Sequence, residues 1–139
     1  MRLSEHRAQF TRDLASLIET ASDFGLVLAI NETGRTRYQQ AEYVRTGRSW
    51  TMNSDHLTPL AVDWVYYIRT PSTYLSPIWA GTRPEIQAAA KFWIDLDPDY
   101  NYWGYAEWQK DTPHMGRKTQ VGHNLRSRIF AGYPEIGFA

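Results

Sequence analysis

The sequence predicts an α+β fold, a small antiparallel sheet flanked by helices, from three observations. Three segments carry the start and stop signals of helices, and three others have the apolar runs of strands. The spacing of these segments is irregular, with long connections such as Thr70–Gly81, which favours an antiparallel sheet over a parallel one. The chain has 139 residues, 42% of them hydrophobic, and no linker-like tract, so we expect a single domain over residues 1–139.

Three helices are expected. The first covers Ser4–Phe24, with Ser4 as its N-cap and Gly25 as its left-handed end. Its apolar residues recur at the spacing of one helical face: Phe10, Leu14, Leu17, Ile18 and Ala21. The other two helices start at capping boxes, Thr36 with Gln39 and Thr82 with Glu85. The second of the three ends at Gly47, and the third has Pro84 in its first turn and ends before Pro98.

Strand candidates lie between and after these helices. They are Leu26–Asn31, Leu60–Ile68 and a last one near His114–Val121. The connection Thr70–Gly81 is expected to be a long surface loop. Residues 116–139 carry Arg117, Lys118, Arg126 and Arg128 against Glu135, and we expect a solvated closing strand and tail there.

Composition excludes several classes of protein. Fifteen basic and fifteen acidic side chains give a net charge of zero, so no nucleic acid is expected as a partner. Without cysteine, any metal must be held by His, Asp or Glu. No apolar run approaches the roughly 20 residues that span a bilayer, and residues 1–10 lack the apolar core of a signal peptide. We therefore expect no membrane insertion, and synthesis in the cytoplasm without a standard export signal.

Two of the four histidines lie near an aspartate in the sequence. His6, at the polar start of a helix, and His123, in a Gly-Asn loop, are expected to be solvated. His56 precedes an apolar strand that contains Asp63, and a carboxylate buried there without a partner would cost several kcal/mol. On one regular strand the two would face opposite sides, but the break at Thr58-Pro59 allows them to meet. The alternative is a surface histidine and an aspartate bonded to a nearby arginine.

A second pair follows in the segment Asp111-Thr112-Pro113-His114. Pro113 excludes a helix interior and places Asp111 and His114 on a turn that leads into a strand. Together the two segments supply two imidazoles and one carboxylate as ligands, and a second carboxylate remains. This is the inventory of a catalytic zinc site, with three protein ligands, an open position for water and a nearby acid–base group.

The order and spacing of these residues resemble the signature of the zinc D-alanyl-D-alanine metallopeptidases, a VanY-like family. Its relatives include the L-alanyl-D-glutamate endopeptidases of bacteriophage endolysins. That family carries S-x-H-x-x-G-x-A-x-D followed by D/E-x-x-H. The first part is matched by Ser54, His56, Ala61 and Asp63, and the second by Asp111 and His114. An upstream E-x-x-R-[ST] segment is matched by Glu32-Thr33-Gly34-Arg35-Thr36. Pro59 stands where the family has Gly, so the local loop is expected to differ.

The resemblance implies the Hedgehog/DD-peptidase fold and Zn²⁺ as cofactor, held by His56, Asp63 and His114. It implies Asp111 as general base and then acid, and Arg35 as the cation that stabilises the oxyanion. Arg35 has a simpler alternative, an ion pair with Glu32 at the start of a helix.

The resemblance also indicates a substrate, the peptidoglycan stem peptide. The family's phage endopeptidases carry Asp in a D-x-P-H segment, which favours cleavage of the L-Ala–D-Glu bond. A D-Ala-D-Ala carboxypeptidase on the same site, a non-catalytic murein-binding domain and a metal-free sugar-binding module remain alternatives. Substrate contacts are expected from Ser54, Tyr67 and Trp108. Further aromatic candidates for the groove are Tyr66, Trp103 and Tyr105, whereas Trp64 and Trp93 are expected in the core.

An endolysin of this type would remain in the host bacterial cytoplasm until lysis and then act on murein in the periplasm. We expect a monomer, without a separate cell-wall-binding domain.

Overall fold

The structure, a computed structural model, describes residues 1–52, 55–57, 60–72 and 74–119. Its centre is an antiparallel sheet in the order β1-β2-β5-β4, with β3 also paired to β2. Over the described residues the strands are β1 (Val27–Glu32), β2 (Ala61–Arg69), β3 (Leu75–Ile78), β4 (Asn101–Trp103) and β5 (His114–Arg117). The helices are α1 (Leu3–Thr20), η1 (Ala21–Phe24), α2 (Arg37–Arg45), η2 (Asp55–Leu57), α3 (Pro84–Leu96) and α4 (Gly104–Trp108).

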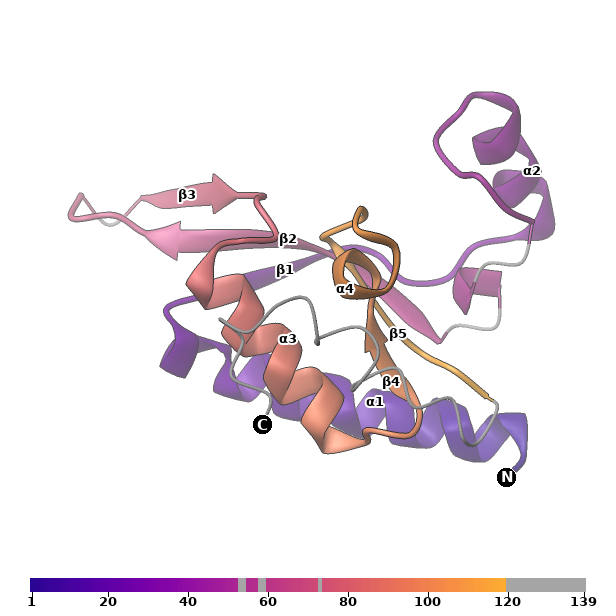
Figure 1. Cartoon of the computed structure of the whole chain (residues 1–139), viewed down its shortest axis with the longest axis horizontal. Coiled ribbons are helices and arrows are strands. Elements are labelled where there is room, and N and C mark those ends of the chain that lie inside the picture. The colour runs from indigo at the N-terminus through magenta and orange to yellow at the C-terminus, as the bar shows by residue number, and fades with distance from the viewer. Residues whose placement is uncertain (53–54, 58–59, 73, 120–139) are drawn as a thin grey trace.

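Helices α1 and α3 lie side by side on one face of the sheet, while α2 stands beyond its opposite face (Figure 1). The expected α+β fold with a small antiparallel sheet flanked by helices is therefore confirmed. No helix among the described segments is long and apolar enough to cross a bilayer.

The first helix begins slightly earlier than expected. Arg2, not Ser4, is the N-cap, and the Glu5 carboxylate accepts the backbone N–H of Arg2 at 2.6 Å. The last turn tightens into the 3₁₀ helix η1 and ends at Gly25, whose φ of 77° is the expected left-handed stop. Phe10, Leu17 and Ala21 are buried, as expected for the apolar face. Ile18 is 46% exposed, so it does not belong to the buried face.

The two capping boxes have different outcomes. At α2, the Thr36 hydroxyl accepts the N–H of Gln39 and the Gln39 side chain accepts the N–H of Thr36, as predicted. The box at Thr82 is wrong, because α3 begins at Pro84 and its N-cap is Arg83. Glu85 forms an ion pair with Arg83 at 2.5 Å instead.

The three predicted strands are present, with shorter bounds for the last. The loop expected at Thr70–Gly81 is wrong in part, since β3 lies within it and pairs with the end of β2. Strand β3 has only four residues and contains Pro77, which an edge strand tolerates where no ladder donor is needed. Such a segment carries little strand signal, and the three-residue β4 carries even less.

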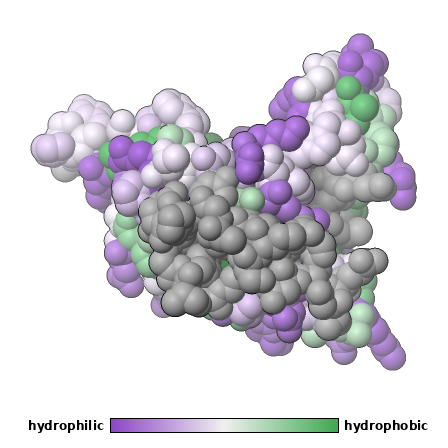
Figure 2. All heavy atoms as spheres, viewed as in Figure 1, coloured by the Kyte–Doolittle hydropathy of each residue, from purple (hydrophilic) through white to green (hydrophobic). Residues whose placement is uncertain are grey.

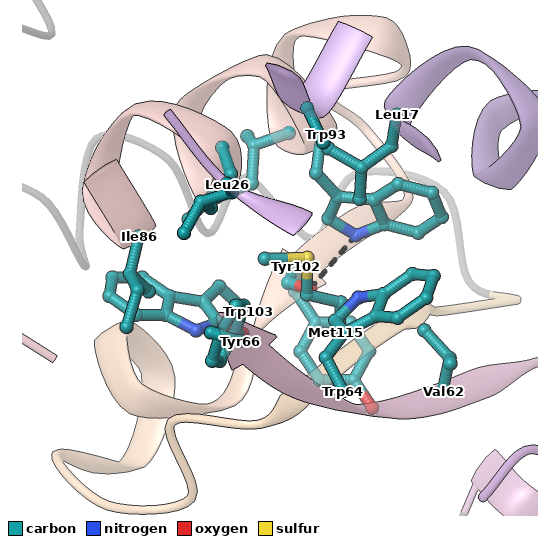
Figure 3. Close-up of a cluster of buried hydrophobic side chains, with 14 of the residues drawn as sticks. Leu17, Leu26, Val62, Trp64, Tyr66, Ile86, Trp93, Tyr102, Trp103 and Met115 are labelled. Atoms are coloured by element: carbon teal, nitrogen blue, oxygen red, sulfur yellow. Dashed lines mark hydrogen bonds between the residues drawn. The ribbon is translucent and has the colours of Figure 1, made fainter. Parts of the chain in front are cut away.

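The core lies between the sheet and helices α1 and α3 (Figure 3). Trp64 and Trp93 belong to it, as predicted, and the Trp93 indole N–H lies 3.1 Å from Tyr102 O and 3.2 Å from Gly116 O. Tyr66 and Trp103, considered for the groove, are also buried. Both donate to the carbonyl of Thr112, at 2.7 and 2.8 Å, so the core holds the turn that precedes His114.

Two polar residues expected in solvent are buried instead. His6 is 2% exposed, and its Nδ1 accepts the Arg117 Nε–H at 3.0 Å. Arg117, fully buried, also donates to Asp97 Oδ2 at 2.6 Å and lies over the Tyr100 ring. The interior accommodates both because the Arg117 charge is paired with Asp97 and the His6 imidazole accepts a hydrogen bond. The other residues of the expected tail, with His123, lie outside the described residues.

Candidate metal and catalytic site

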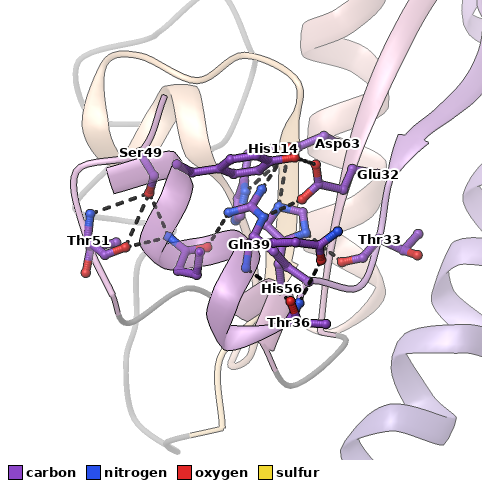
Figure 4. Close-up of polar contacts among 12 residues, drawn as sticks. Glu32, Thr33, Thr36, Gln39, Ser49, Thr51, His56, Asp63 and His114 are labelled. Atoms are coloured by element: carbon purple, nitrogen blue, oxygen red, sulfur yellow. Dashed lines mark hydrogen bonds and ion pairs between the residues drawn. The ribbon is translucent and has the colours of Figure 1, made fainter. Parts of the chain in front are cut away.

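The candidate site forms where β2 and β5 pair. Asp63 on β2 lies directly opposite His114 on β5 and opposite Glu32 on β1, so three strands meet at this carboxylate. His56 comes from the short helix η2, which precedes β2. The side chains of Asp63, His56 and His114 converge on one point (Figure 4).

The nitrogen and oxygen atoms of these three side chains are close enough to bind one metal ion together. Asp63 Oδ1 lies 3.3 Å from His56 Nε2 and 3.3 Å from His114 Nδ1. One ligand atom from each residue falls within 4.8 Å of the others. The His56 side chain is only 2% exposed, so the alternative of a surface histidine does not hold.

The second nitrogen of each imidazole has its own partner. His56 Nδ1 lies 2.6 Å from the carbonyl oxygen of Thr33, so Nδ1 carries the proton and Nε2 the lone pair. His114 Nε2 lies 2.7 Å from the Tyr102 hydroxyl. When Nε2 donates to that oxygen, the lone pair of Nδ1 faces Asp63. Such outer contacts fix the tautomer and ring orientation of metal-binding histidines.

The Asp63 carboxylate is poised for a cation. Burial raises its pKa, but the imidazoles of His114 and His56, when protonated, outweigh this and hold the pKa well below its usual range. Among the described residues its buried Oδ1 has no hydrogen bond of good geometry. Two imidazole nitrogens and an ionised carboxylate oxygen are the donors of catalytic zinc sites, and the residues present therefore fit such an ion.

Arg35 enters the site from the segment before α2. Its Nε donates to Glu32, its Nη1 lies 2.6 Å from Gln40 Oε1, and its Nη2 lies 3.8 Å from Asp63 Oδ2. The ion pair with Glu32 therefore forms, and the guanidinium also faces the carboxylate of the site. With 9% of its side chain exposed and its guanidinium over the Tyr43 ring, it is held in one orientation.

Asp111 lies beside the converging ligands without being one of the three. Its Oδ2 is 3.8 Å from His114 Nδ1, and its side chain remains 30% exposed. Burial raises its pKa above the usual value, and the Asp63 charge adds to this, although the two histidines and Arg35 act in the opposite direction. Its backbone is left-handed, with φ of 67°, which is uncommon outside glycine and frequent at functional turns.

A cavity of about 110 Å³, open to solvent, lies in front of these residues. Figure 2 shows the surface hollowed between the β2–β3 hairpin and α2, with hydrophilic side chains at the base of the hollow. Twelve residues line the cavity: Arg35, Arg48, Ser49, Trp50, Thr51, His56, Asp63, Tyr102, Trp108, Asp111, His114 and Lys118.

Of the three predicted substrate contacts, Trp108 lines the cavity and Tyr67 is not among the lining residues. Ser54 lies outside the described residues, as does Pro59. Sequence reasoning did not single out Trp50, Tyr102 or Lys118 as cavity residues. Their positions depend on packing between distant segments, for example the edge-to-face contact of Trp50 with Trp108 at 5.4 Å.

Comparison with solved structures identifies a related fold. The chain is similar to the L-Ala D-Glu endopeptidase ChiX of Serratia marcescens, with 27% sequence identity and a TM-score of 0.56 over 96% of this chain and 91% of that one. It matches no protein-family model and no curated protein.

The chain shares the fold of this endopeptidase. The predicted Hedgehog/DD-peptidase fold is thereby confirmed. The similarity also supports a peptidase of peptidoglycan and the endopeptidase family that the sequence motifs resemble.

Proposed function

We propose that the protein is a zinc-dependent endolysin that hydrolyses the L-Ala–D-Glu bond of peptidoglycan stem peptides. The observation that carries the proposal is the convergence of His56, Asp63 and His114, with Asp111 beside them, on the fold of an L-Ala D-Glu endopeptidase. The similarity supports the peptidase class, while the metal, the bond and the residue roles are proposed here.

In this proposal the metal is held by His56 Nε2, Asp63 Oδ1 and His114 Nδ1. When bound, a zinc ion supplies Lewis acidity and lowers the pKa of a water to about 7. Asp111 accepts the proton of the attacking water and delivers it to the nitrogen of the leaving amine. Its raised pKa suits both halves of this transfer.

Arg35 is proposed to stabilise the negative charge that develops on the scissile carbonyl oxygen. The contacts with Glu32 and Gln40 hold its guanidinium so that Nη2 faces the site before substrate arrives. A preorganised donor of this kind contributes about 3–4 kcal/mol to an acyl-transfer transition state.

The choice of bond rests on the Asp in the D-x-P-H segment and on the activity of the structural neighbour. A D-Ala-D-Ala carboxypeptidase would use the same ligands and is the alternative. The endolysin role, with storage in the host cytoplasm and action on periplasmic murein, follows from the sequence resemblance alone.

The test is mass spectrometry of purified murein after digestion, with the Asp111→Asn protein as a control. The proposal predicts new L-Ala C-termini and D-Glu N-termini that are absent with the variant. Released D-Ala would show instead that the protein is a D-Ala-D-Ala carboxypeptidase. Intact murein, with a correctly folded and metal-loaded protein, would contradict a peptidase of this substrate.

A further inference from the structure

The cavity carries more positive charge than the proposed chemistry uses. Histidines aside, its lining has three cations and two anions. Arg35 is committed to Glu32, Gln40 and the reacting carbonyl, and the two aspartates are committed to metal and proton transfer. The remaining two charges, Arg48 and Lys118, have no assigned role.

Arg48 is exposed at the cavity and lies next to α2. Its guanidinium sits over the Tyr43 ring, 4.2 Å from the centroid, on the same ring that Arg35 contacts at 4.6 Å. Among the described residues no ion pair with a carboxylate involves Arg48. Stacking on an aromatic ring orients a guanidinium and leaves its N–H groups available for a planar carboxylate.

Lys118 approaches the cavity from the end of β5. Its Nζ lies 4.2 Å from the centroid of the Tyr102 ring and 5.7 Å from that of Trp108. It also pairs with Glu107, whose Oε1 lies 3.8 Å away. The ammonium is therefore positioned by aromatic faces at the cavity wall.

Trp50 and Trp108 give this part of the cavity an apolar wall. The two rings meet edge to face, and the Lys110 Nζ lies over the Trp50 ring, 4.0 Å from its centroid. Because aromatic surface excludes water, a charge pair formed beside it is screened less than at an open surface.

We infer that Arg48 and Lys118 form a subsite for a free carboxylate on the leaving side of the scissile bond, which makes the enzyme selective for unamidated D-glutamate. The inference rests on the proposed function. When D-glutamate is joined onward through its γ-carboxyl group, its α-carboxylate stays free, on the residue that supplies the leaving amine. Amidation to D-isoglutamine removes this charge with almost no change in shape, so the two peptides form a matched pair.

The test compares muropeptides that carry L-Ala–γ-D-Glu with otherwise identical ones that carry L-Ala–D-isoglutamine. The native protein is expected to cleave the acid with a kcat/KM about tenfold or more above that for the amide, as for one charge-assisted contact. Arg48→Gln and Lys118→Met are each expected to remove most of this preference, through a higher KM for the acid and little change for the amide. Arg45→Gln, at an exposed residue, and Lys91→Met, at a half-buried one, both outside the cavity, are the matched controls and should retain it.

Binding supplies a second readout that does not require turnover. Calorimetry with the Asp111→Asn protein should show the same preference for the acid, and loss of that preference in the double variants with Arg48→Gln or Lys118→Met. Equal cleavage and equal binding of acid and amide by the native protein would overturn the subsite but leave the peptidase intact. If neither peptide is bound or cleaved, the result contradicts both the proposed function and the subsite.

Discussion

The Tyr102 hydroxyl lies 2.7 Å from His114 Nε2, the ring nitrogen that faces away from Asp63. Tyr102 is 1% exposed and comes from β4, which pairs with the strand that carries His114. The sheet thus fixes the position of the imidazole, and when Nε2 donates to the Tyr102 oxygen, the lone pair of Nδ1 faces the metal position.

Tyr102→Phe should therefore weaken metal binding without unfolding the protein. Loss of an outer contact to a metal-binding histidine reduces metal affinity by about 10–100-fold. Competition with a chromogenic chelator measures the zinc dissociation constant directly. Tyr74→Phe, at a residue that is 76% exposed, is the control. Equal zinc affinity of Tyr102→Phe and the native protein would show that the hydroxyl does not orient His114.

Gly116→Ala should disturb the same contact by displacing Tyr102. A Cβ at Gly116 would lie 2.6 Å from the Tyr102 hydroxyl oxygen and 2.7 Å from two ring carbons, which are buried and cannot move freely. We expect a loss of about 1–3 kcal/mol in the free energy of unfolding, measured by urea denaturation, together with weaker zinc binding. Gly34→Ala is the control, since nothing lies within 4 Å of a Cβ there. A Gly116→Ala protein with native stability and zinc affinity would contradict the packing described.

Asp111→Asn and Asp63→Asn should separate catalysis from metal binding. Asp111 lies outside the three converging ligands, so its amide variant should keep bound zinc while kcat falls by about 10²–10⁴-fold. Asp63→Asn should lose zinc and activity together. Metal analysis and a murein cleavage assay on the same preparations distinguish the two outcomes. Loss of zinc in Asp111→Asn would place Asp111 among the ligands instead.

His6 should make the protein less stable in mild acid. Burial lowers its pKa, and the neighbouring Arg117 and the N-terminus lower it further, against the opposing carboxylates of Asp97 and Glu5. The unfolded chain, with an ordinary value of about 6.5, therefore binds more protons as the pH falls through that value. The stability that neutral His6 contributes is present above this pH and is lost below it.

The measurement is the urea midpoint at about pH 7.5 and about pH 5.5. His6→Asn keeps an acceptor for Arg117 Nε and cannot titrate, so its midpoint should fall less between the two pH values than that of the native protein. An equal fall in both proteins would exclude His6 as a source of the acid sensitivity.

The sequence predicted the fold where signals were local. The capping box at Thr36 and the left-handed Gly25 depend on a few neighbouring residues, and both are confirmed. The burial of Arg117 depends on a partner distant in the chain and was missed. Strand β3 was missed although it pairs with the preceding strand, because its four residues include Pro77 and carry little strand signal. From the sequence alone, a polar residue at a helix start or a strand end is expected to face solvent, because its partner on another element is not known. This explains the errors at His6 and Arg117.

For the site, the motif spacing brought out His56, Asp63, Asp111 and His114, and the structure places these four together. Their roles remain predictions. The contact of Tyr102 with His114 Nε2 and the edge-to-face pair of Trp50 and Trp108 could not be predicted, because they join segments that only the folded sheet brings side by side.

The most direct test of the central claim is zinc titration of chelator-treated protein, with bound metal and murein hydrolysis measured in the same samples. The account predicts that hydrolysis is lost on chelation and returns in proportion to zinc, up to one ion per chain, and that His56→Ala binds no zinc and stays inactive. Full hydrolysis by metal-free protein, or by the His56→Ala variant, would contradict the account.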